Sequence, residues 1–267
     1  MIHPQAQVDP QAKLDEDVYV GPWTEIGPGV EIGAGSRIES HSIVRGNTYI
    51  GKNNHVFSFC TLGDAPQDKK YVDDGQSRLL IGDGNTIREY CSVNCGTQHG
   101  GGVTRIGDDN WIMAYCHIAH DCQVGNHTIF ANNATLAGHV EIHDYVILGG
   151  FTGVHQFCRM GESSFSAISA IILKDVPPYF MVEGNSARPR SVNRVGLKRR
   201  GFSASAIADV KSAYKILYRQ SRTLHNALDE LEDRAKHSPE IERLVSFIKT
   251  SDRGIVREPS KTTDNGE

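Results

Sequence analysis

Six histidines lie between residues 117 and 155 of this 267-residue chain, and four of them are candidate site residues: His117, His120, His139 and His155. Asp121 follows His120 directly. A neutral imidazole can take the proton from a hydroxyl group near neutral pH, and a neighbouring carboxylate can fix its tautomer and stabilise the imidazolium that forms. We therefore predict that His120 is a general base and that Asp121 orients it.

An aliphatic residue at every sixth position sets the geometry on which this chemistry depends. The period runs from Val8 to Leu62, resumes from Ile81 to Val93, and runs again from Ile106 towards Ile172. It fits neither an amphipathic helix nor a long alternating strand. It is typical of a solenoid with three short strands per turn of 18 residues, stacked about 4.8 Å apart. We therefore expect a mainly β fold, a parallel β-helix. Hexapeptide-repeat proteins, which the pattern resembles, coil to the left.

Residues 18 positions apart should stack on one face of such a coil. His120 then lies beneath Gly138, and Gly138 beneath Gln156, while Asp121 and His139 share the neighbouring column. Gly138 has no side chain to block its N–H, which could donate to a developing oxyanion. No serine or cysteine nucleophile is in register with this patch, so we favour direct acyl transfer in a ternary complex.

Two other interpretations of the histidines remain open. They could be surface residues of a scaffold that has no enzymatic activity. They could also bind a metal, because His117 and His120 are three residues apart and trimeric β-helical carbonic anhydrases use three histidines across a subunit boundary. We predict no metal and no bound cofactor.

Five of the six cysteines occupy one position of the repeat, four residues after the aliphatic one. We interpret them as small buried packing groups rather than as ligands or disulfide partners; they are Cys60, Cys91, Cys116, Cys122 and Cys158. Cys95 lies outside this register.

The period slips twice, near residues 63–80 and 94–105, which predicts two loop insertions in a β-helix that spans residues 1–186. Loops on a rigid scaffold often carry binding residues. A small α-helical C-terminal domain should follow at 187–257, with helices at 203–219, 223–236 and 239–250, the last capped by Ser238. Residues 258–267 are predicted to be a disordered tail.

The composition excludes several classes of protein. No run approaches the roughly 18 apolar residues of a membrane span, and the N-terminus has no signal-peptide pattern. The net charge is −4, which favours no nucleic-acid partner. We therefore expect a cytoplasmic protein without stable membrane insertion.

Several motifs resemble the UDP-N-acetylglucosamine O-acyltransferases of lipid A biosynthesis. They are HIAHDC at 117–122, ANNATLAGH at 131–139, VHQFC at 154–158, DVPPY at 175–179, GLKRRGF at 196–202, AYK at 213–215 and RGIVR at 253–257. The resemblance implies a homotrimer with active sites between neighbouring β-helices. It also implies transfer of an (R)-3-hydroxyacyl chain from acyl carrier protein, the thioester co-substrate, to the glucosamine 3-hydroxyl of UDP-N-acetylglucosamine.

The resemblance also assigns roles to individual residues. It makes His120 the base, Asp121 its orienting partner and Gly138 the oxyanion donor. The implied substrate-binding residues are Asp68, Lys70, His117, His139, His155, Gln156, Asn193, Arg199 and Arg200. Basic residues between Arg188 and Arg200 would meet an acidic partner, here acyl carrier protein.

Three departures from the family pattern stand out. Asn94-Cys95 replaces a His-Arg pair that relatives usually carry, and Val195 stands where relatives often have a glutamate. Ile168 occupies a position that is glycine in members that accept long chains, so we predict a shorter acyl chain for this protein.

Rival enzymes remain within the same fold. One is the related N-acyltransferase, which normally has an extra domain before the coil. Another is a coenzyme-A-dependent acetyltransferase, which would not explain Asp68 and Lys70. The acceptor could also be a 3-amino analogue of the sugar nucleotide.

Overall fold

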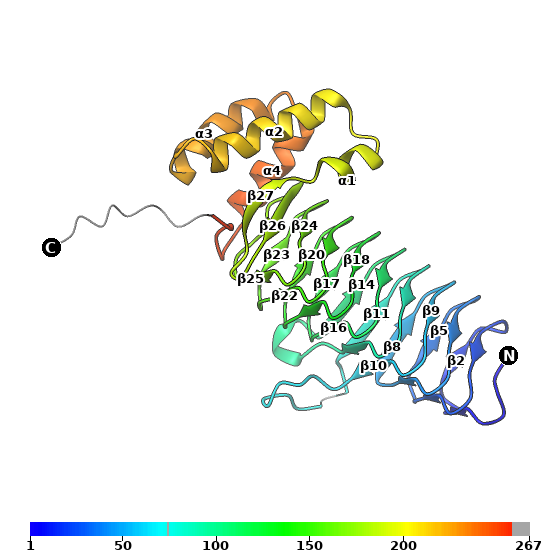
Figure 1. The fold of residues 1–267 in the computed structure, drawn as a ribbon. Coiled ribbons are helices and arrows are strands. Elements are labelled where there is room, and N and C mark those ends of the chain that lie inside the picture. The colour runs from blue at the N-terminus through cyan, green and yellow to red at the C-terminus, as the bar shows by residue number, and fades with distance from the viewer. Residues whose placement is uncertain (74, 258–267) are drawn as a thin grey trace.

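The computed structural model describes residues 1–73 and 75–257. Short strands wind into a left-handed parallel β-helix of triangular cross-section, as predicted, in which every third strand joins the same sheet (Figure 1). Paired residues are usually 18 positions apart, as Gln7 with Glu25 and Glu25 with Ile43. The six-residue period therefore gives both the fold and the register.

Three sheets form the faces of the coil. Sheet I consists of β1 (Gln7–Val8), β4 (Glu25–Ile26), β7 (Ile43–Val44), β10 (Thr61–Asp64), β13 (Ser92–Asn94), β16 (His117–Ile118), β19 (Thr135–Leu136), β22 (Gly153–Val154) and β25 (Ile171–Ile172). Sheet II consists of β2 (Lys13–Leu14), β5 (Glu31–Ile32), β8 (Asn47–Ile50), β11 (Arg78–Ile81), β14 (Val103–Ile106), β17 (Gln123–Val124), β20 (Glu141–Ile142) and β23 (Arg159–Met160). Sheet III consists of β3 (Tyr19–Val20), β6 (Arg37–Ile38), β9 (His55–Val56), β12 (Thr86–Ile87), β15 (Trp111–Ile112), β18 (Ile129–Phe130), β21 (Ile147–Leu148), β24 (Phe165–Ser166), β26 (Phe180–Glu183) and β27 (Arg188–Val192).

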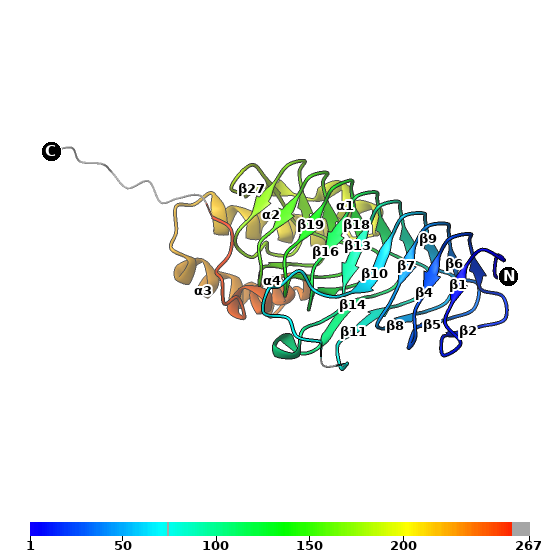
Figure 2. The same ribbon diagram turned by 90° about the horizontal axis from the view of Figure 1, so that it is seen from below.

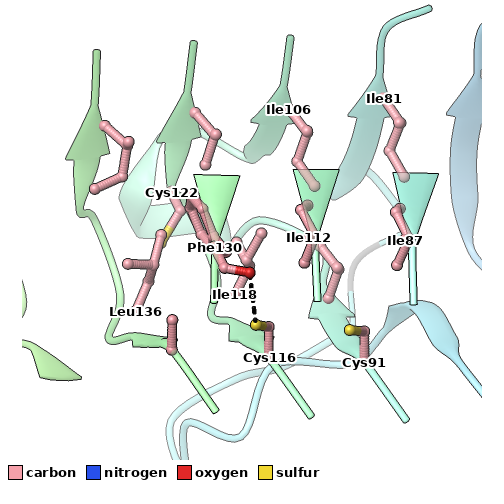
Figure 3. Close-up of a cluster of buried hydrophobic side chains, with 14 of the residues drawn as sticks. Ile81, Ile87, Cys91, Ile106, Ile112, Cys116, Ile118, Cys122, Phe130 and Leu136 are labelled. Carbon is pink, nitrogen blue, oxygen red and sulfur yellow. Dashed lines mark hydrogen bonds between the residues drawn. The ribbon is translucent and has the colours of Figure 1, made fainter. Parts of the chain in front are cut away.

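The core of the coil is built from the repeating aliphatic side chains. Ile87, Ile118 and Leu136 are fully or almost fully buried, and burying such a side chain stabilises a fold by about 1.5–3 kcal/mol. Cysteines fill the smaller second position between them (Figure 3). All six cysteines are free and buried. Burial raises the pKa of the Cys122 thiol to about 12 and that of Cys158 to about 11, so these thiols pack and do not ionise.

Each rung turns sharply at the corners between sheets. We call the corner that follows each strand of sheet I corner I–II, and the corner that precedes each strand of sheet I corner III–I. Residues at these corners adopt left-handed backbone conformations, for example Asp121 (φ 59°), His139 (φ 61°) and Phe157 (φ 63°). The corners therefore project side chains outward in vertical columns.

Both insertions leave the coil at corner I–II (Figure 1). The first lies between β10 and β11, and the second between β13 and β14, where it includes the 3₁₀ turn η1 (Gln98–Gly100). Thr61 pairs with Ser92, and Ser92 with His117, so the ladder resumes after each insertion. The insertions thus add chain to one edge of the coil and leave the sheets intact.

Helices cover the end of the coil that is opposite the N-terminus (Figures 1 and 2). They are α1 (Arg194–Arg199), α2 (Ala204–Tyr218), α3 (Leu224–Ala235) and α4 (Pro239–Lys249). Ser203 and Thr223 cap α2 and α3 through their hydroxyls, whereas the Ser238 hydroxyl accepts no capping bond. Helix α1 was not predicted from the sequence.

The transition from coil to helices is gradual. Strand β27 lies beyond residue 186, yet it pairs with β26 and extends sheet III to Val192. None of the helices in residues 1–73 and 75–257 has the length and apolarity needed to cross a membrane. The predicted tail at 258–267 lies outside the described residues.

Candidate active site

His120 and Asp121 form a hydrogen-bonded pair at corner I–II. His120 Nδ1 donates to Asp121 Oδ2 at 2.8 Å. The Asp121 side chain is only 1% exposed and that of His120 is 18% exposed. Donation from Nδ1 leaves Nε2 of a neutral imidazole as the free acceptor, which is the arrangement that a general base requires.

Gly138 lies directly against the His120 ring, one rung further along the coil. A Cβ atom at Gly138 would come within 2.5 Å of His120 Cε1 and 2.7 Å of Nε2. Among the described residues, the Gly138 N–H donates no hydrogen bond. The predicted stacking therefore places an unused N–H donor beside the proposed base.

His139 completes the cluster. Its ring meets that of His120 edge-on at a centroid distance of 5.1 Å and stacks on Phe157 at 4.5 Å. Burial lowers the pKa of His139 from its ordinary value, which favours a neutral ring at pH 7. Its Nε2 lies 3.8 Å from Asp121 Oδ2.

A pocket of about 590 Å³ opens over this cluster. Its lining comes from both insertions and from three rungs of corner I–II; the residues are Asp68, Lys70, Tyr71, Val72, Thr97, Gln98, His99, Gly100, His120, His139 and Phe157. The structure thus brings the predicted Asp68 and Lys70 to His120. Asp68 Oδ1 accepts from the Lys70 N–H at 2.9 Å, which shapes the tip of the first insertion.

The contribution of the second insertion, above all of Thr97 and Gly100, was not predicted from the sequence. A signal for it was present. Each period slip follows a strand of sheet I, after Leu62 and Val93, just as His120 follows Ile118. Counting strands in threes would have placed both insertions at the corner that carries the histidines.

The departure Asn94-Cys95 joins the two insertions. Asn94 Nδ2 donates to the Ala65 carbonyl at 3.0 Å, and the Cys95 N–H donates to the Asp64 carbonyl at 3.1 Å. Cys95 Sγ also lies 4.0 Å from the hydroxyl of Tyr71. These contacts hold the first insertion against the base of the second.

His117, His155 and Gln156 lie near this pocket but do not line it. His117 is on the outer face of sheet I, where Nδ1 is 2.7 Å from the Ser92 hydroxyl, and burial lowers its pKa. His155 and Gln156 are exposed at corner I–II, two rungs beyond His120.

Asn193, Arg199 and Arg200 lie elsewhere in the chain. Asn193 and Arg199 line a pocket of about 1030 Å³ on sheet III and α1, together with the exposed Val195. Arg200 pairs with Glu162 at 2.9 Å. Because sheet III is the face opposite corner I–II, one chain does not bring these residues to His120.

The Asn193 and Arg200 side chains also have structural contacts. Asn193 Oδ1 caps α1 by accepting from the Gly196 N–H, and its Nδ2 donates to the Ser163 carbonyl at 2.9 Å. The Arg200 guanidinium lies over the Tyr145 ring at 3.5 Å. Of the three residues, Arg199 is the one that is exposed.

Corner III–I carries a column of exposed rings. Trp23, His41, Phe59, Tyr90 and Tyr115 stack in succession, with centroids 4.9 to 5.0 Å apart. Ile168 lies at the same corner, three rungs beyond Tyr115, and is 71% exposed. Corner III–I therefore lies along one edge of sheet I, and His120 lies along the opposite edge, at corner I–II.

The same cluster could also hold a metal ion. One ligand atom each from His120, Asp121 and His139 lies within 4.8 Å of the others. Imidazole and carboxylate ligands suit zinc. However, Asp121 Oδ2 already accepts from His120 Nδ1 and from the Thr97 hydroxyl at 2.6 Å. An ion would therefore have to displace at least one of these bonds.

Comparison with known proteins identifies relatives over most of the chain. A family model described as UDP N-acetylglucosamine O-acyltransferase, domain 2, matches residues 175–256, and a bacterial transferase hexapeptide (six repeats) model matches residues 104–138. The acyl-[acyl-carrier-protein]–UDP-N-acetylglucosamine O-acyltransferase of Thiobacillus denitrificans is 55% identical over 204 residues, which are 76% of this chain and 79% of that protein. The protein of the same name from Albidiferax ferrireducens is 52% identical over 213 residues, 78% of this chain and 80% of that protein.

Solved structures agree with this result. The UDP-N-acetylglucosamine acyltransferase of Francisella novicida matches with a TM-score of 0.95 at 42% identity, covering 97% of this chain and 95% of that one. The UDP-N-acetylglucosamine O-acyltransferase of Moraxella catarrhalis matches with a TM-score of 0.93 at 40% identity, covering 96% and 99%.

Proposed function

Because this chain belongs to the UDP-N-acetylglucosamine O-acyltransferase family, and is therefore an acyltransferase, we propose that it transfers an (R)-3-hydroxyacyl chain from acyl carrier protein to the glucosamine 3-hydroxyl of UDP-N-acetylglucosamine. This is the first step of lipid A biosynthesis. The observation that carries the proposal is the His120–Asp121 pair, which lies beside the Gly138 N–H in a pocket walled by Asp68 and Lys70.

The reaction proceeds in a ternary complex. His120 Nε2 takes the proton of the acceptor hydroxyl as its oxygen attacks the thioester carbonyl. The Gly138 N–H donates to the oxyanion that forms. Collapse of this intermediate breaks the carbon–sulfur bond, and the departing thiolate of acyl carrier protein takes the proton back from the His120 imidazolium. Asp121 holds the imidazole in the required tautomer throughout.

The polar walls of the pocket suit a sugar nucleotide. Lys70 offers an ammonium group to the phosphates, and Asp68 offers a carboxylate to sugar hydroxyls. Neutral His139 can donate or accept a hydrogen bond at the acceptor. His117, His155 and Gln156 extend this surface along sheet I and corner I–II, where the acyl chain and its 3-hydroxyl would lie.

A homotrimer completes the site. If sheet III of one chain faces sheet I of the next in a cyclic trimer, Asn193, Arg199 and Arg200 of the neighbour approach corner I–II, where they can hold the nucleotide. The surfaces support this arrangement. The outward residues of β18, β21 and β24 are Ile129, Ile147 and Phe165, whereas sheet II presents charged residues.

The same arrangement gives corner III–I a role. The corner shared by the two contacting faces must point to the threefold axis, where the exposed column from Trp23 to Tyr115 would meet its two copies. Aromatic rings are enriched in the cores of protein interfaces. The stacked rings therefore support an axis at this corner.

Exposed basic residues near α1 fit an acidic carrier protein. Arg194, Lys198 and Arg199 are exposed on or beside the sheet III pocket. Arg190 is exposed as well, although it contacts Glu183 at 3.3 Å. We propose that this surface receives acyl carrier protein. We place the enzyme in the cytoplasm, where its six free cysteines would stay reduced.

In this proposal the acyl chain crosses the outer face of sheet I between β16 and β25, where the outward residues include Thr135, Gly153 and Ile171. Gly153 lies outward on β22 between Thr135 and Ile171, and it adds no side chain to the track that the acyl chain would follow. Ile168 lies at the far edge of this face, at corner III–I. Its branched side chain would close the track and limit the length of the acyl chain.

Replacing Ile168 by glycine should therefore lengthen the preferred chain. The apolar contacts that a longer chain gains are worth about 0.8 kcal/mol for each buried CH₂, so two added carbons should raise kcat/KM for the longer thioester by about tenfold. The measurement is a chain-length series on acyl carrier protein. An unchanged preference in Ile168→Gly, or a wild-type preference for the longest chain, would contradict the proposal.

Identification of the product tests the proposed function directly. Purified protein, UDP-N-acetylglucosamine and (R)-3-hydroxyacyl carrier protein should give a 3-O-acylated sugar nucleotide that is labile to alkali. A 3-amino analogue, coenzyme A thioesters and a chelator provide the control arms. Preference for the amino sugar would contradict the proposed acceptor, and preference for coenzyme A thioesters would contradict the proposed acyl donor. Loss of activity on chelation would favour the metal interpretation.

A further inference from the structure

The second insertion turns back onto the carboxylate of Asp121. We propose that Thr97 is a positioning residue for acyl transfer, which fixes the plane of the Asp121 carboxylate against His120. The inference rests on the proposed role of His120 as the base and goes beyond it, because it assigns the second insertion a part in catalysis.

Thr97 holds both oxygens of Asp121. Its N–H donates to Oδ1 at 2.9 Å, and its hydroxyl donates to Oδ2 at 2.6 Å. The Asp121 N–H is bound as well, to the Thr104 hydroxyl at 2.8 Å. Hydrogen bonds to an ionised carboxylate are short and about twice as strong as neutral ones. Thr97 therefore supplies two strong contacts from one residue.

These contacts decide which oxygen faces the base. The terminal torsion of an aspartate is broad and roughly two-fold, so one hydrogen bond leaves the carboxylate plane poorly fixed. With Oδ1 bound to the Thr97 amide and Oδ2 to its hydroxyl, the plane is set, and the remaining lone pair of Oδ2 points to His120 Nδ1. Thr97 acts on the imidazole only through Asp121.

Thr97 is also the anchor of its own loop. Its carbonyl accepts from the N–H groups of Gly100 and Gly102, at 3.0 and 2.9 Å. A Cβ atom at Gly100 would lie 2.1 Å from Asp121 Oδ2 and 2.5 Å from His139 Cε1. The backbone of Gly100 is outside the left-handed region, so its conformation does not require glycine. A side chain is excluded there because it would collide with Asp121 and His139. The loop is closely fitted to the Asp121 carboxylate.

The test compares two substitutions of nearly the same shape. Thr97→Val keeps the amide contact and removes the hydroxyl, whereas Thr97→Ser keeps both. We expect Thr97→Val to lower kcat by about 10- to 100-fold, the usual effect of losing a residue that orients a functional side chain. KM for both substrates should stay within about twofold, since Thr97 acts on the transition state through the base. Thr97→Ser should retain near wild-type kcat.

A double-mutant cycle separates positioning from a purely structural role. In an Asp121→Asn background, Thr97→Val should cost less than about twofold, because its partner carboxylate is already gone. Additive losses, or a rise in KM with unchanged kcat, would overturn the assignment. Gly100→Ala provides an independent variant, since its Cβ displaces Asp121 Oδ2, and full activity in it would also overturn the assignment.

These outcomes are distinct from failure of the proposed function. If wild-type protein forms no acylated UDP-N-acetylglucosamine, the function itself is wrong. If wild-type protein is active and Thr97→Val matches it, the positioning role alone is wrong.

Discussion

The His120→Ala variant is expected to lose at least about a thousandfold in kcat, near the upper end of what positioned general bases contribute. Neither His139 nor Asp121, the two titratable residues in contact with it, can replace it. His139 lies edge-on to His120, and burial lowers its pKa, so it is a weak base held at a different angle. Asp121 is buried and its oxygens are already bound. The hydroxyl of the acceptor would then have to react without a base.

Loss of activity in this variant should occur without loss of structure. His120 projects from corner I–II and contributes nothing to the core of the coil, so the thermal transition and the oligomeric state should match those of the wild type. His225→Ala is a suitable control because this histidine is exposed on α3. Turnover of His120→Ala within tenfold of the wild type would rule out the base assignment.

Trimers that mix two inactive variants should regain activity, which is the second large effect that we expect. His120→Ala and Arg199→Ala should each be nearly inactive alone, because each lacks one half of every shared site. Co-expressed with different affinity tags and purified through both, they should regain activity, since some sites then combine an intact His120 with an intact Arg199. Every mixed cyclic trimer contains one interface of this kind, so about one site in three should be restored.

A matched pair controls for nonspecific rescue. When His120→Ala chains are co-expressed with Asp121→Asn chains, both defects lie on the same half of the site. Mixed trimers of these two variants should therefore stay inactive. If the His120 and Arg199 variants form mixed trimers without regaining activity, the two residues do not serve a shared site.

The sequence predicted the coil, its insertions and the stacking of His120, Asp121 and Gly138, because these follow from one period. Residues 18 apart must meet in a β-helix, whatever the intervening residues are. The packing of the C-terminal helices depends on contacts that do not repeat along the sequence, so spacing does not predict it. Helix α1 was not predicted because a six-residue helix has little periodicity of its own.

The role of Thr97 could not be predicted from spacing. Its contact with Asp121 depends on the path of an eight-residue loop between β13 and β14, and a loop has no register that links its residues to the coil. The same reasoning applies to Arg199, which is close to His120 only if a second chain supplies it. Spacing within one chain cannot locate a residue that another chain contributes.

The column of rings at corner III–I has a practical consequence. The protein has two tryptophans. Trp23 begins this column and is 57% exposed, and Trp111 lies outward on sheet III at 46% exposure. Both therefore lie on surfaces that would be covered between subunits, and no tryptophan lies in the core. In the proposed trimer, their fluorescence emission would consequently shift to the blue on assembly, so these two residues would report subunit association.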